Sequence, residues 1–442
     1  MSTSPLESDL MGGASRLRGL DPAKWVVGFF VANFLLQRVS VLPTGNLSAA
    51  MPLAVGWVAL ALARRVVVLE PRRFLLWLTT AGVSGLVLMA QLALVPGPII
   101  SLSSWMFWLV AWLPFVVRVR DASAATYRRC AEGIARAGVW MGALSVLFLL
   151  TQLVGLPYRD YFGQLVPRVL QVQGFVISYP ISYGSPIYRS NAWFALEPSF
   201  LSFTLAVSAM CAIYAGMRWW GLMTILAGIM ATFAGSGIAV LVVALIVLAI
   251  SRDRYLLRPY LPALVLVSVV AVLTPLQQLV FSRAGEFTNS GSSSSLRGVE
   301  PYLNLWPTWV SDTWGLLLGH GAGSSRVILD GMGVPGLVVP NVARALFDYG
   351  VVVGFVLLCL IVLAHLRSPA PALAAGILVS LLLLQPGAQG ILNCLFAAVT
   401  WWAPTAWQAR PARPRSQAAH RGEADWRLQY EPPGVAPSLP QR

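Results

Sequence analysis

Residues 219–251 read WWGLMTILAGIMATFAGSGIAVLVVALIVLAIS and contain no charged side chain. A membrane-spanning helix needs about 20 consecutive apolar residues, so this run is too long for one span and slightly short for two. Gly235-Ser236-Gly237 stands inside the run, and glycine tolerates the backbone angles of a sharp reversal. The stretch therefore predicts two membrane helices, 219–234 and 236–251, joined by a tight turn.

The rest of the chain has the same apolar character. Of its 442 residues, 57% are hydrophobic and 11% are charged, whereas soluble domains carry about 25% charged residues. The apolar runs are continuous rather than alternating, which excludes a membrane β-barrel as well as a soluble globular enzyme. We predict an all-α polytopic membrane protein with twelve transmembrane helices, at 25–42, 47–63, 74–95, 99–117, 137–156, 193–217, 219–234, 236–251, 259–281, 349–366, 371–386 and 390–408.

Basic residues indicate the orientation, because cytoplasmic loops hold an excess of Lys and Arg. With both termini in the cytoplasm, the inner segments hold most of the basic residues of this chain, whose net charge is +14. Arg38 lies within the first predicted span. This placement favours membrane orientation over nucleic-acid binding. The outer arginines fall in two long loops, 157–192 and 282–348, and are Arg159, Arg168, Arg189, Arg283, Arg297, Arg326 and Arg344.

Three segments follow from this pattern. Residues 1–24 form a cytoplasmic N-terminal segment, and we expect the apolar run after them to be an anchor rather than a cleaved signal peptide. Residues 25–408 form the transmembrane bundle. Residues 409–442, rich in proline and arginine, form a disordered cytoplasmic tail. Function is expected in the two long outer loops, because long loops over a rigid scaffold usually carry it.

Motifs of soluble enzymes are missing from the sequence. It contains no G-x-x-x-x-G-K-[ST] loop, no H-E-x-x-H and no G-x-S-x-G, which argues against ATP-driven transport by this chain alone. The four cysteines are scattered singly, without a nearby histidine at ligand spacing. We therefore expect neither a metal site nor a disulfide.

Glu197 is the first candidate for chemistry. It precedes Pro198 where the chain enters the sixth predicted span from the outside. Proline is tolerated in the first turn of a helix, so either the regular helix begins at Glu197-Pro198 or a kink frees the carbonyl of Phe194. A partly desolvated carboxylate suits a general base. The alternative is a structural residue at the start of the helix, paired with Arg189.

The outer arginines are the second candidate. A guanidinium fork matches phosphate oxygens, so Arg168, Arg189, Arg283, Arg297, Arg326 and Arg344 together suggest a diphosphate or acidic-sugar ligand. Each single arginine is more simply explained by solvation or by pairing with an acidic residue of the same loops. The acidic residues available are Asp160, Glu286, Glu300, Asp312, Asp330 and Asp348.

Glycine and tryptophan mark the second outer loop. Residues 318–325, LGHGAGSS, offer backbone N–H groups for an anion-binding nest, with His320 as a proton shuttle or diphosphate donor. The alternative is an ordinary glycine-rich loop. Trp306, Trp309 and Trp314 form either an interfacial aromatic belt or a platform for sugar rings.

In these residues the chain resembles the O-antigen ligase and polymerase superfamily of bacterial envelope glycan assembly. The resemblance covers roughly residues 185–365 and rests on the order of several short features. They are Arg189 with Glu197-Pro198-Ser199, the hairpin Gly235-Ser236-Gly237, Arg297 before a Trp-bearing loop, Gly319-His320-Gly321, and Asn341 ahead of Ala345-Leu346-Phe347-Asp348-Tyr349-Gly350. Family members often carry arginine where Gly237 stands here. Ligases often carry His-Asn where this chain has Pro340-Asn341, which favours a polymerase.

The resemblance implies a GT-C-like fold and a glycosyltransferase of the bacterial inner membrane without nucleotide sugar, metal or other cofactor. It would join undecaprenyl-diphosphate-linked oligosaccharides at the periplasmic face into O-antigen, capsule or exopolysaccharide, alongside a flippase and a chain-length regulator. Arg189, Glu197, Arg297 and His320 would be catalytic, and Arg168, Arg283, Trp306, Arg326, Asn341 and Arg344 would bind substrate. Two alternatives are a ligase that transfers finished glycan to a lipid or protein, and a lipid-linked sugar transporter or flippase.

Overall fold

The computed structural model describes residues 21–42, 47–173, 175, 177–181, 184–273, 295–333, 337, 339–366, 368–384, 392, 397 and 399–402. Most of the predicted N-terminal segment, the whole tail 409–442 and most of the twelfth predicted span lie outside these residues. Arg283 also lies outside them. The side chain of Arg297 is not described, although its backbone is.

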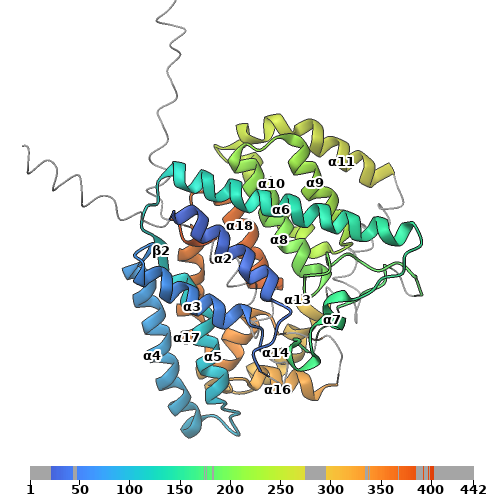
Figure 1. Cartoon of the computed structure of the whole chain (residues 1–442). Helices are drawn as coiled ribbons and strands as arrows, with labels where there is room; N and C mark the ends of the chain where they lie inside the picture. Colours follow the sequence, from blue (N-terminus) through green and yellow to red (C-terminus); the bar gives the residue numbers. More distant parts are fainter. Residues whose placement is uncertain are drawn as a thin grey trace, which may run out of the picture.

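The described chain is mostly helical (Figure 1). Its only sheet is a two-stranded antiparallel one, in which Val67 of β1 lies opposite Val119 of β2. In chain order the described elements are α2 (Pro22–Leu36), α3 (Ala50–Ala63), β1 (Val67–Leu69), α4 (Pro71–Leu94), α5 (Leu102–Trp112), η1 (Leu113–Val116), β2 (Val117–Val119), α6 (Ala124–Leu153), α7 (Tyr161–Leu165), η2 (Arg168–Leu170), α8 (Pro198–Ala215), α9 (Trp219–Ala231), α10 (Gly235–Ile250), η3 (Arg254–Tyr260), α11 (Leu261–Leu273), α13 (Ser295–Gly298), α14 (Glu300–Ser311), α15 (Thr313–Leu318), α16 (Ser324–Gly331), α17 (Asn341–Leu366), α18 (Pro371–Val379) and η4 (Ser380–Leu384).

Four helices in the described part of the chain are long and apolar enough to cross a membrane: α4, α6, α8 and α17. A fifth span would arise if α10 and residues 254–266, which meet at a bend of 116°, were counted as one. Five further apolar helices have 10–17 residues, so they are at most about 26 Å long against a hydrocarbon core of about 30 Å. Among the described residues, the structure thus gives a helical protein with four or five candidate full-length spans, fewer than the predicted twelve.

Helix ends explain this difference in number. Hydropathy counts apolar residues, but a helix stops where side chains satisfy its terminal backbone groups. After α2, the side-chain amide of Gln37 folds back onto the helix, and its Nε2 donates to the carbonyl of Phe34. After α9, the Thr232 hydroxyl donates to the carbonyl of Ile229. Several predicted spans therefore form helices shorter than their apolar runs.

The remaining boundaries differ from the predictions in instructive ways. The division of the opening run into two helices is confirmed, since α9 and α10 lie close to 219–234 and 236–251. The turn, however, falls at residues 232–234, where Phe233 has φ of +47°, and Gly235-Ser236-Gly237 forms the first turn of α10. α6 begins at Ala124 rather than 137, because the Ser123 hydroxyl caps it by accepting from the N–H of Thr126. α17 begins at Asn341 rather than 349. Gly350, with φ of +74°, breaks it where the predicted span starts.

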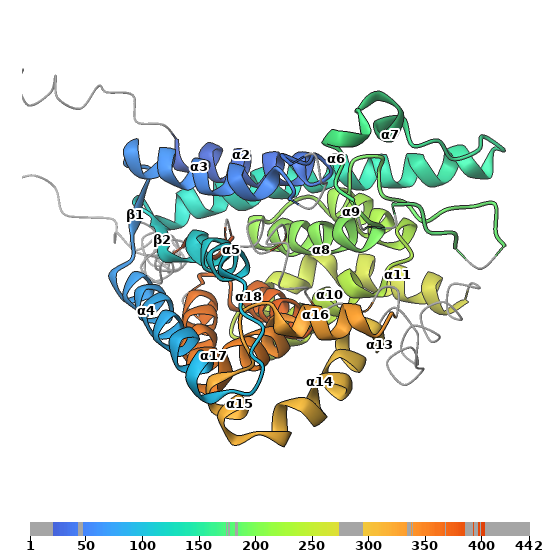
Figure 2. The ribbon, with the colours of Figure 1, turned by 90° about the horizontal axis from the view of Figure 1, so that it is seen from below.

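Loops that were predicted on the same side of the membrane lie together in the structure. On one side β1 and β2 pair, and on the opposite side lie α7, α13 and α14, in both Figure 1 and Figure 2. At the first end, Val119 N–H also donates to the Trp401 carbonyl, and Tyr260 Oη donates to the Met217 carbonyl. At the second end, Ile99 N–H donates to the His320 carbonyl, and Ser190 N–H donates to the Ala231 carbonyl. We call these the inner and the outer end, after the sides of the membrane predicted from the sequence.

α4 shows the surface pattern of a lipid-facing helix. Its buried residues include Arg73, Thr80, Ser84 and Gln91. Its exposed large side chains are Leu75, Leu78, Leu86, Met89, Leu92 and Leu94. A soluble helix has the opposite arrangement, with apolar residues inside. The exposed apolar face therefore fits contact with lipid tails.

The core is centred on α8, whose residues are almost all buried. α6, α9 and α10 pack closely around it, and their glycines allow this. A Cβ on Gly138 of α6 would collide with Ser208 of α8, and one on Gly237 of α10 would collide with the backbone of Ser202. At the inner end Trp401 is fully buried, stacks on Phe29 of α2 and donates to the carbonyl of Pro114.

Candidate functional site

The loop before α8 carries the first group of candidate residues. Two consecutive residues other than glycine, Ala192 and Trp193, adopt the left-handed backbone region with φ of +50° and +60°. Such residues cost roughly 1–3 kcal/mol each and persist only where their surroundings fix them. Here Ser190 Oγ accepts from the N–H of Ala192, and Asn191 Oδ1 accepts from the N–H of Trp193. The loop is therefore an ordered turn rather than the first part of a helix.

Glu197 ends this turn and occupies the N-cap position of α8, without a capping hydrogen bond from its side chain. Its backbone is extended, and Pro198 occupies the first helical position, where a missing N–H costs nothing. Of the two sequence-based alternatives, the structure adopts a helix that begins at Glu197-Pro198. Glu197 is only 4% exposed, and Ser199 Oγ donates to its Oε2 at 3.0 Å. A buried carboxylate thus lies at a helix N-terminus, where the helix dipole stabilises negative charge.

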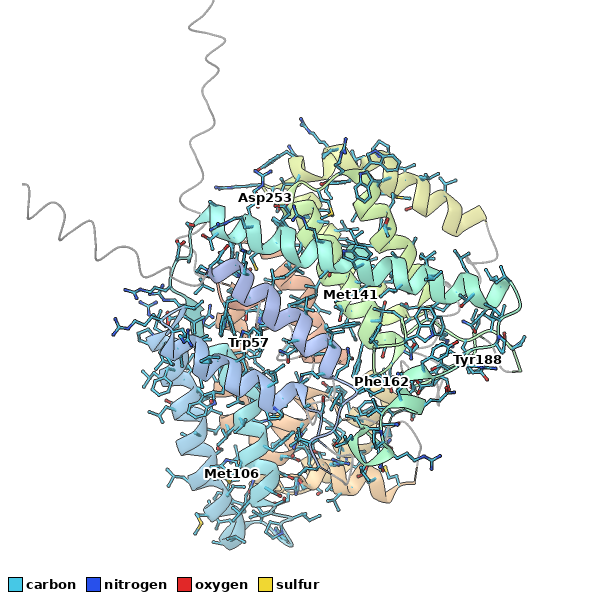
Figure 3. All side chains as sticks on the ribbon, in the orientation of Figure 1. Trp57, Met106, Met141, Phe162, Tyr188 and Asp253 are labelled. Atoms are coloured by element: carbon cyan, nitrogen blue, oxygen red, sulfur yellow. The ribbon has the colours of Figure 1, made fainter. Side chains whose placement is uncertain are left out.

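Arg189 lies in the same loop and is half-buried. Its Nε donates to the carbonyl of Pro180 at 3.2 Å, and its guanidinium lies 5.8 Å from the ring centroid of Tyr179. The neighbouring Tyr188 is attached to α6, since its N–H donates to Gln152 Oε1 at 2.7 Å. Figure 3 shows Tyr188 and Phe162 of this loop on the side of the molecule away from Asp253. The structure therefore places Arg189 at the outer end, eight residues before Glu197 in an ordered loop.

Asp348 organises the second group of candidate residues. It is completely buried, and both carboxylate oxygens accept hydrogen bonds from the start of α16. The N–H of Gly323 donates to Oδ2 at 3.0 Å, and the N–H of Ser325 donates to Oδ1 at 2.8 Å. The Ser324 hydroxyl adds a bond to Oδ1 at 3.1 Å. Asp348 thus caps α16 from a distant part of the chain.

The predicted anion-binding nest therefore forms, and its anion is a carboxylate of the protein itself. Glycine is required in this loop, because Gly319, Gly321 and Gly323 have φ of +83°, +107° and +92°. The main chain of the loop also binds α17 and α4, since Gly321 N–H donates to the carbonyl of Asp348, and Gln91 Nε2 donates to the carbonyl of Leu318 as well as to that of Asp348. Two of the N–H groups proposed for a diphosphate thus already bind Asp348.

Arg344 and Asn341 lie on the first turns of α17, beside Asp348. Arg344 is buried, and its Nε lies 3.5 Å from Asp348 Oδ2 without forming a hydrogen bond among the described residues. Asn341 is also buried, and its Nδ2 donates to the carbonyl of Leu381 at 2.6 Å. Arg344 is therefore a nearly desolvated cation at the outer end, whereas Asn341 joins α17 to η4.

His320 completes this group. Its ring stacks on Phe347 with centroids 4.6 Å apart, and its backbone N–H donates to the Phe347 carbonyl. Burial lowers the pKa of His320 below its usual value of 6.5, although Asp312 and Asp348 oppose this shift. The imidazole is therefore neutral at pH 7. Neutral imidazole suits proton transfer better than charge neutralisation of a diphosphate.

The other predicted residues are less enclosed. Arg168 is exposed in η2. Arg326 is exposed and pairs with Asp330 one turn along α16, at 3.2 Å. Trp306 is exposed on α14 and packs edge-on against Trp309. Arg297 lies in α13 with its side chain undescribed, and Arg283 lies outside the described residues. α14 and α16, which carry Trp306 and Arg326, pack on α17 through Leu305, Leu329, Ala343 and Phe347.

Sequence reasoning missed the residues that hold both groups in place. The sequence gives Asp348 as a possible partner of an arginine and as part of the motif behind the resemblance, but with no role of its own, and Gln37, Gln91 and Arg38 fall in or beside predicted apolar spans. One signal was available, because a polar side chain near the end of an apolar run needs a hydrogen-bond partner. The identity of the partner, however, depends on the three-dimensional arrangement.

Among the described residues, no group of three or more His, Cys, Asp and Glu side chains is placed to hold a metal ion. No family model and no curated protein matches the chain.

Proposed function

We propose that this chain is a glycosyltransferase of the bacterial inner membrane that polymerises undecaprenyl-diphosphate-linked oligosaccharide repeat units at the periplasmic face. The observation that carries the proposal is the buried carboxylate of Glu197 at the outer start of α8, in the ordered loop that also holds Arg189. The second group, around Arg344 and His320, lies at the same end. A carboxylate and guanidinium groups at one end of a membrane bundle suit a reaction between lipid-linked substrates at the interface.

The proposal includes a bundle with both termini in the cytoplasm and a GT-C-like arrangement of twelve spans. The short apolar helices α2, α3, α5, α9 and α18 would cross together with their neighbours, which is feasible where the bilayer thins or polar residues line the ends. The pairing of loops at the inner and outer ends supports this alternation of direction.

The reaction requires little covalent chemistry from the protein. The hydroxyl oxygen of an incoming repeat unit forms a bond to the anomeric carbon of the growing glycan, whose bond to the diphosphate oxygen breaks. The diphosphate leaves with the electron pair, and the hydroxyl proton passes to Glu197. Arg189 and Arg297 would neutralise the diphosphate, with Arg344, Arg326, Arg168 and Arg283 in support, and His320 would relay the proton. Orientation and electrostatics would supply most of the rate.

Replacement of Glu197 by Gln tests the proposed base. The variant keeps the shape of the side chain but cannot take up a proton, so we expect polymer formation to fall by about 10²–10⁴-fold. The measurement is the conversion of purified lipid-linked repeat units into polymer by the reconstituted protein. Glu132→Gln is the matched control, because Glu132 is an exposed carboxylate near the inner end of α6. Full activity of Glu197→Gln would remove Glu197 from the chemistry.

Arg297→Lys tests the guanidinium contribution. A lysine retains the charge but cannot form two parallel hydrogen bonds to a phosphate, so we expect shorter polymers or none. Normal chain lengths would exclude Arg297 from the site.

Deletion of the gene in the producing bacterium separates polymerase from ligase. Surface glycan with a single repeat unit supports a polymerase, and accumulation of long lipid-linked polymer indicates a ligase instead.

A further inference from the structure

Arg38 follows α2 and is one of the most deeply buried charges of the protein. Its side chain is 1% exposed, and it makes three different contacts with the outer loop. Nη2 donates to Asp160 Oδ2 at 2.6 Å, Nη1 donates to the carbonyl of Trp193 at 2.8 Å, and the guanidinium lies 4.4 Å from the ring centroid of Phe162. The proposed reaction makes no use of this cation. Figure 3 shows the position of Phe162.

The carbonyl that Arg38 binds belongs to the strained turn. Trp193 is the second of the two left-handed residues, and four residues later the chain reaches Glu197. Asn191 and Ser190 stabilise the turn from inside through the N–H groups of Trp193 and Ala192. Arg38, just beyond the end of α2, donates to the Trp193 carbonyl and fixes its direction.

Two further contacts join the same end of α2 to this loop. Gln37 Oε1 accepts from the N–H of Leu196, directly before Glu197. Val172 N–H donates to the carbonyl of Arg38, and Val39 pairs with Gln171 in an isolated antiparallel bridge. The end of α2 thus holds the loop on both sides of Arg189, near residues 170–172 and near residues 193–196.

A buried cation at this place is costly unless several groups bind it. Arg38 meets this requirement, because it contacts one carboxylate, one carbonyl and one aromatic ring. An apolar residue could not make the hydrogen bonds to the carboxylate and the carbonyl. The bonds converge on the segment that determines where Glu197 lies. We propose that Arg38, paired with Asp160, is a positioning residue that holds the left-handed turn at 192–193 and thereby fixes the carboxylate of Glu197. This inference rests on the proposed function for its catalytic part only.

Hydrogen exchange and kinetics of the full-length protein in lipid nanodiscs test the two parts separately. Arg38→Gln removes the charge and the fork, and we expect exchange in peptides covering 190–197 to rise by about tenfold or more. Exchange in α4 and α17 should not change. Arg38→Lys should give an intermediate effect. The matched control is Arg136→Gln, because Arg136 also contacts a carboxylate, Glu132, at 2.6 Å but is exposed to solvent.

Kinetics then show whether the turn matters for the reaction. Displacement of a catalytic group by about 1 Å costs about a hundredfold in rate, so kcat of Arg38→Gln should fall by about that factor while KM for the repeat unit stays within about twofold. Arg38→Lys should recover part of kcat. If Arg38 only stabilised the fold, its replacement would lower the amount of folded protein and would not lower kcat of the folded protein at an unchanged KM.

Each result decides the proposal. Unchanged exchange at 190–197 in Arg38→Gln would overturn the positioning role, and so would raised exchange together with normal kcat. If Arg38→Gln raises exchange throughout the protein, the Asp160→Asn variant is used instead. Asparagine keeps the shape of the Asp160 side chain and removes only the ion pair with Arg38. A wild-type protein without polymerising activity would refute the proposed function, whereas the exchange experiment would still decide whether Arg38 holds the turn.

Discussion

At the scale of single residues, two arginine–aspartate pairs with the same spacing have very different surroundings. Arg344 and Asp348 are buried, whereas Arg326 and Asp330 are both exposed. Removal of one partner from a buried pair costs about 3–5 kcal/mol, because the other charge stays desolvated. An exposed pair contributes about 0–1 kcal/mol. The same chemical change should therefore have unequal effects at the two sites.

Asp348→Asn should lower the thermal unfolding midpoint markedly, and Asp330→Asn should leave it almost unchanged. Asp348→Asn also weakens the cap of α16, since an amide offers one acceptor atom instead of two. Thermal unfolding in detergent at pH 7.5 gives both values. Equal midpoints for the two variants would contradict the role of Asp348 in holding residues 323–325.

His320 should make the outer end sensitive to acid. Burial lowers its pKa in the folded protein, so the unfolded chain takes up a proton first as the pH falls. The stability linked to His320 is complete above pH 6.5, the usual pKa of the unfolded side chain, and is lost progressively as the pH falls towards the lower pKa of the folded state. Unfolding midpoints between pH 8 and pH 5 should thus decrease less in His320→Gln than in the wild type. Parallel curves would show that His320 titrates normally.

At the scale of secondary-structure elements, close contact between α6 and α9 depends on glycine. A Cβ on Gly228 would lie 2.5 Å from the Cα of Gly142, and Ser145 Oγ donates to the carbonyl of Gly228 at 2.9 Å. Small residues at helix crossings stabilise membrane bundles because they let the backbones approach.

Gly228→Ala should therefore destabilise the protein by about 1–3 kcal/mol through overpacking. Gly82→Ala on α4 is the control, because no atom lies within 4 Å of its added Cβ. There the higher helix propensity of alanine should stabilise by up to about 1 kcal/mol. Denaturation of the two variants in the same detergent compares them directly. A stabilising Gly228→Ala substitution would show that α6 and α9 are further apart than in the structure.

The elements also show what sequence can and cannot predict. Long apolar runs gave the positions of most helices, because hydropathy depends on neighbouring residues alone. The start of α17 was missed, since Asn341, Arg344 and Asp348 look like a polar loop until their partners are known. Those partners are distant in sequence: Asp348 binds Gly323 and Ser325, and Arg38 binds Asp160. A helix start at Glu197 was one of two alternatives predicted from the sequence, because its signal, the following proline, is local; the choice between them needed the contacts of residues 190–196.

At the scale of the whole molecule, the proposed orientation can be measured. In a variant without the four native cysteines, Arg159→Cys should react with an impermeant thiol reagent added to spheroplasts. Arg65→Cys and Asp121→Cys should react only after the membrane is opened, because both residues lie at the inner end and are exposed. Labelling of all three positions from the same side would contradict the separation of inner and outer ends.

The position of Trp401 has a consequence for biogenesis. This residue is synthesised long after α2, yet its indole stacks on Phe29 and its carbonyl accepts from β2. α3 and α6 can pack against α2 early, but the surface around Phe29 takes up its final contact only after almost the whole polypeptide has been synthesised. Completion of this end of the bundle is therefore a late step of assembly.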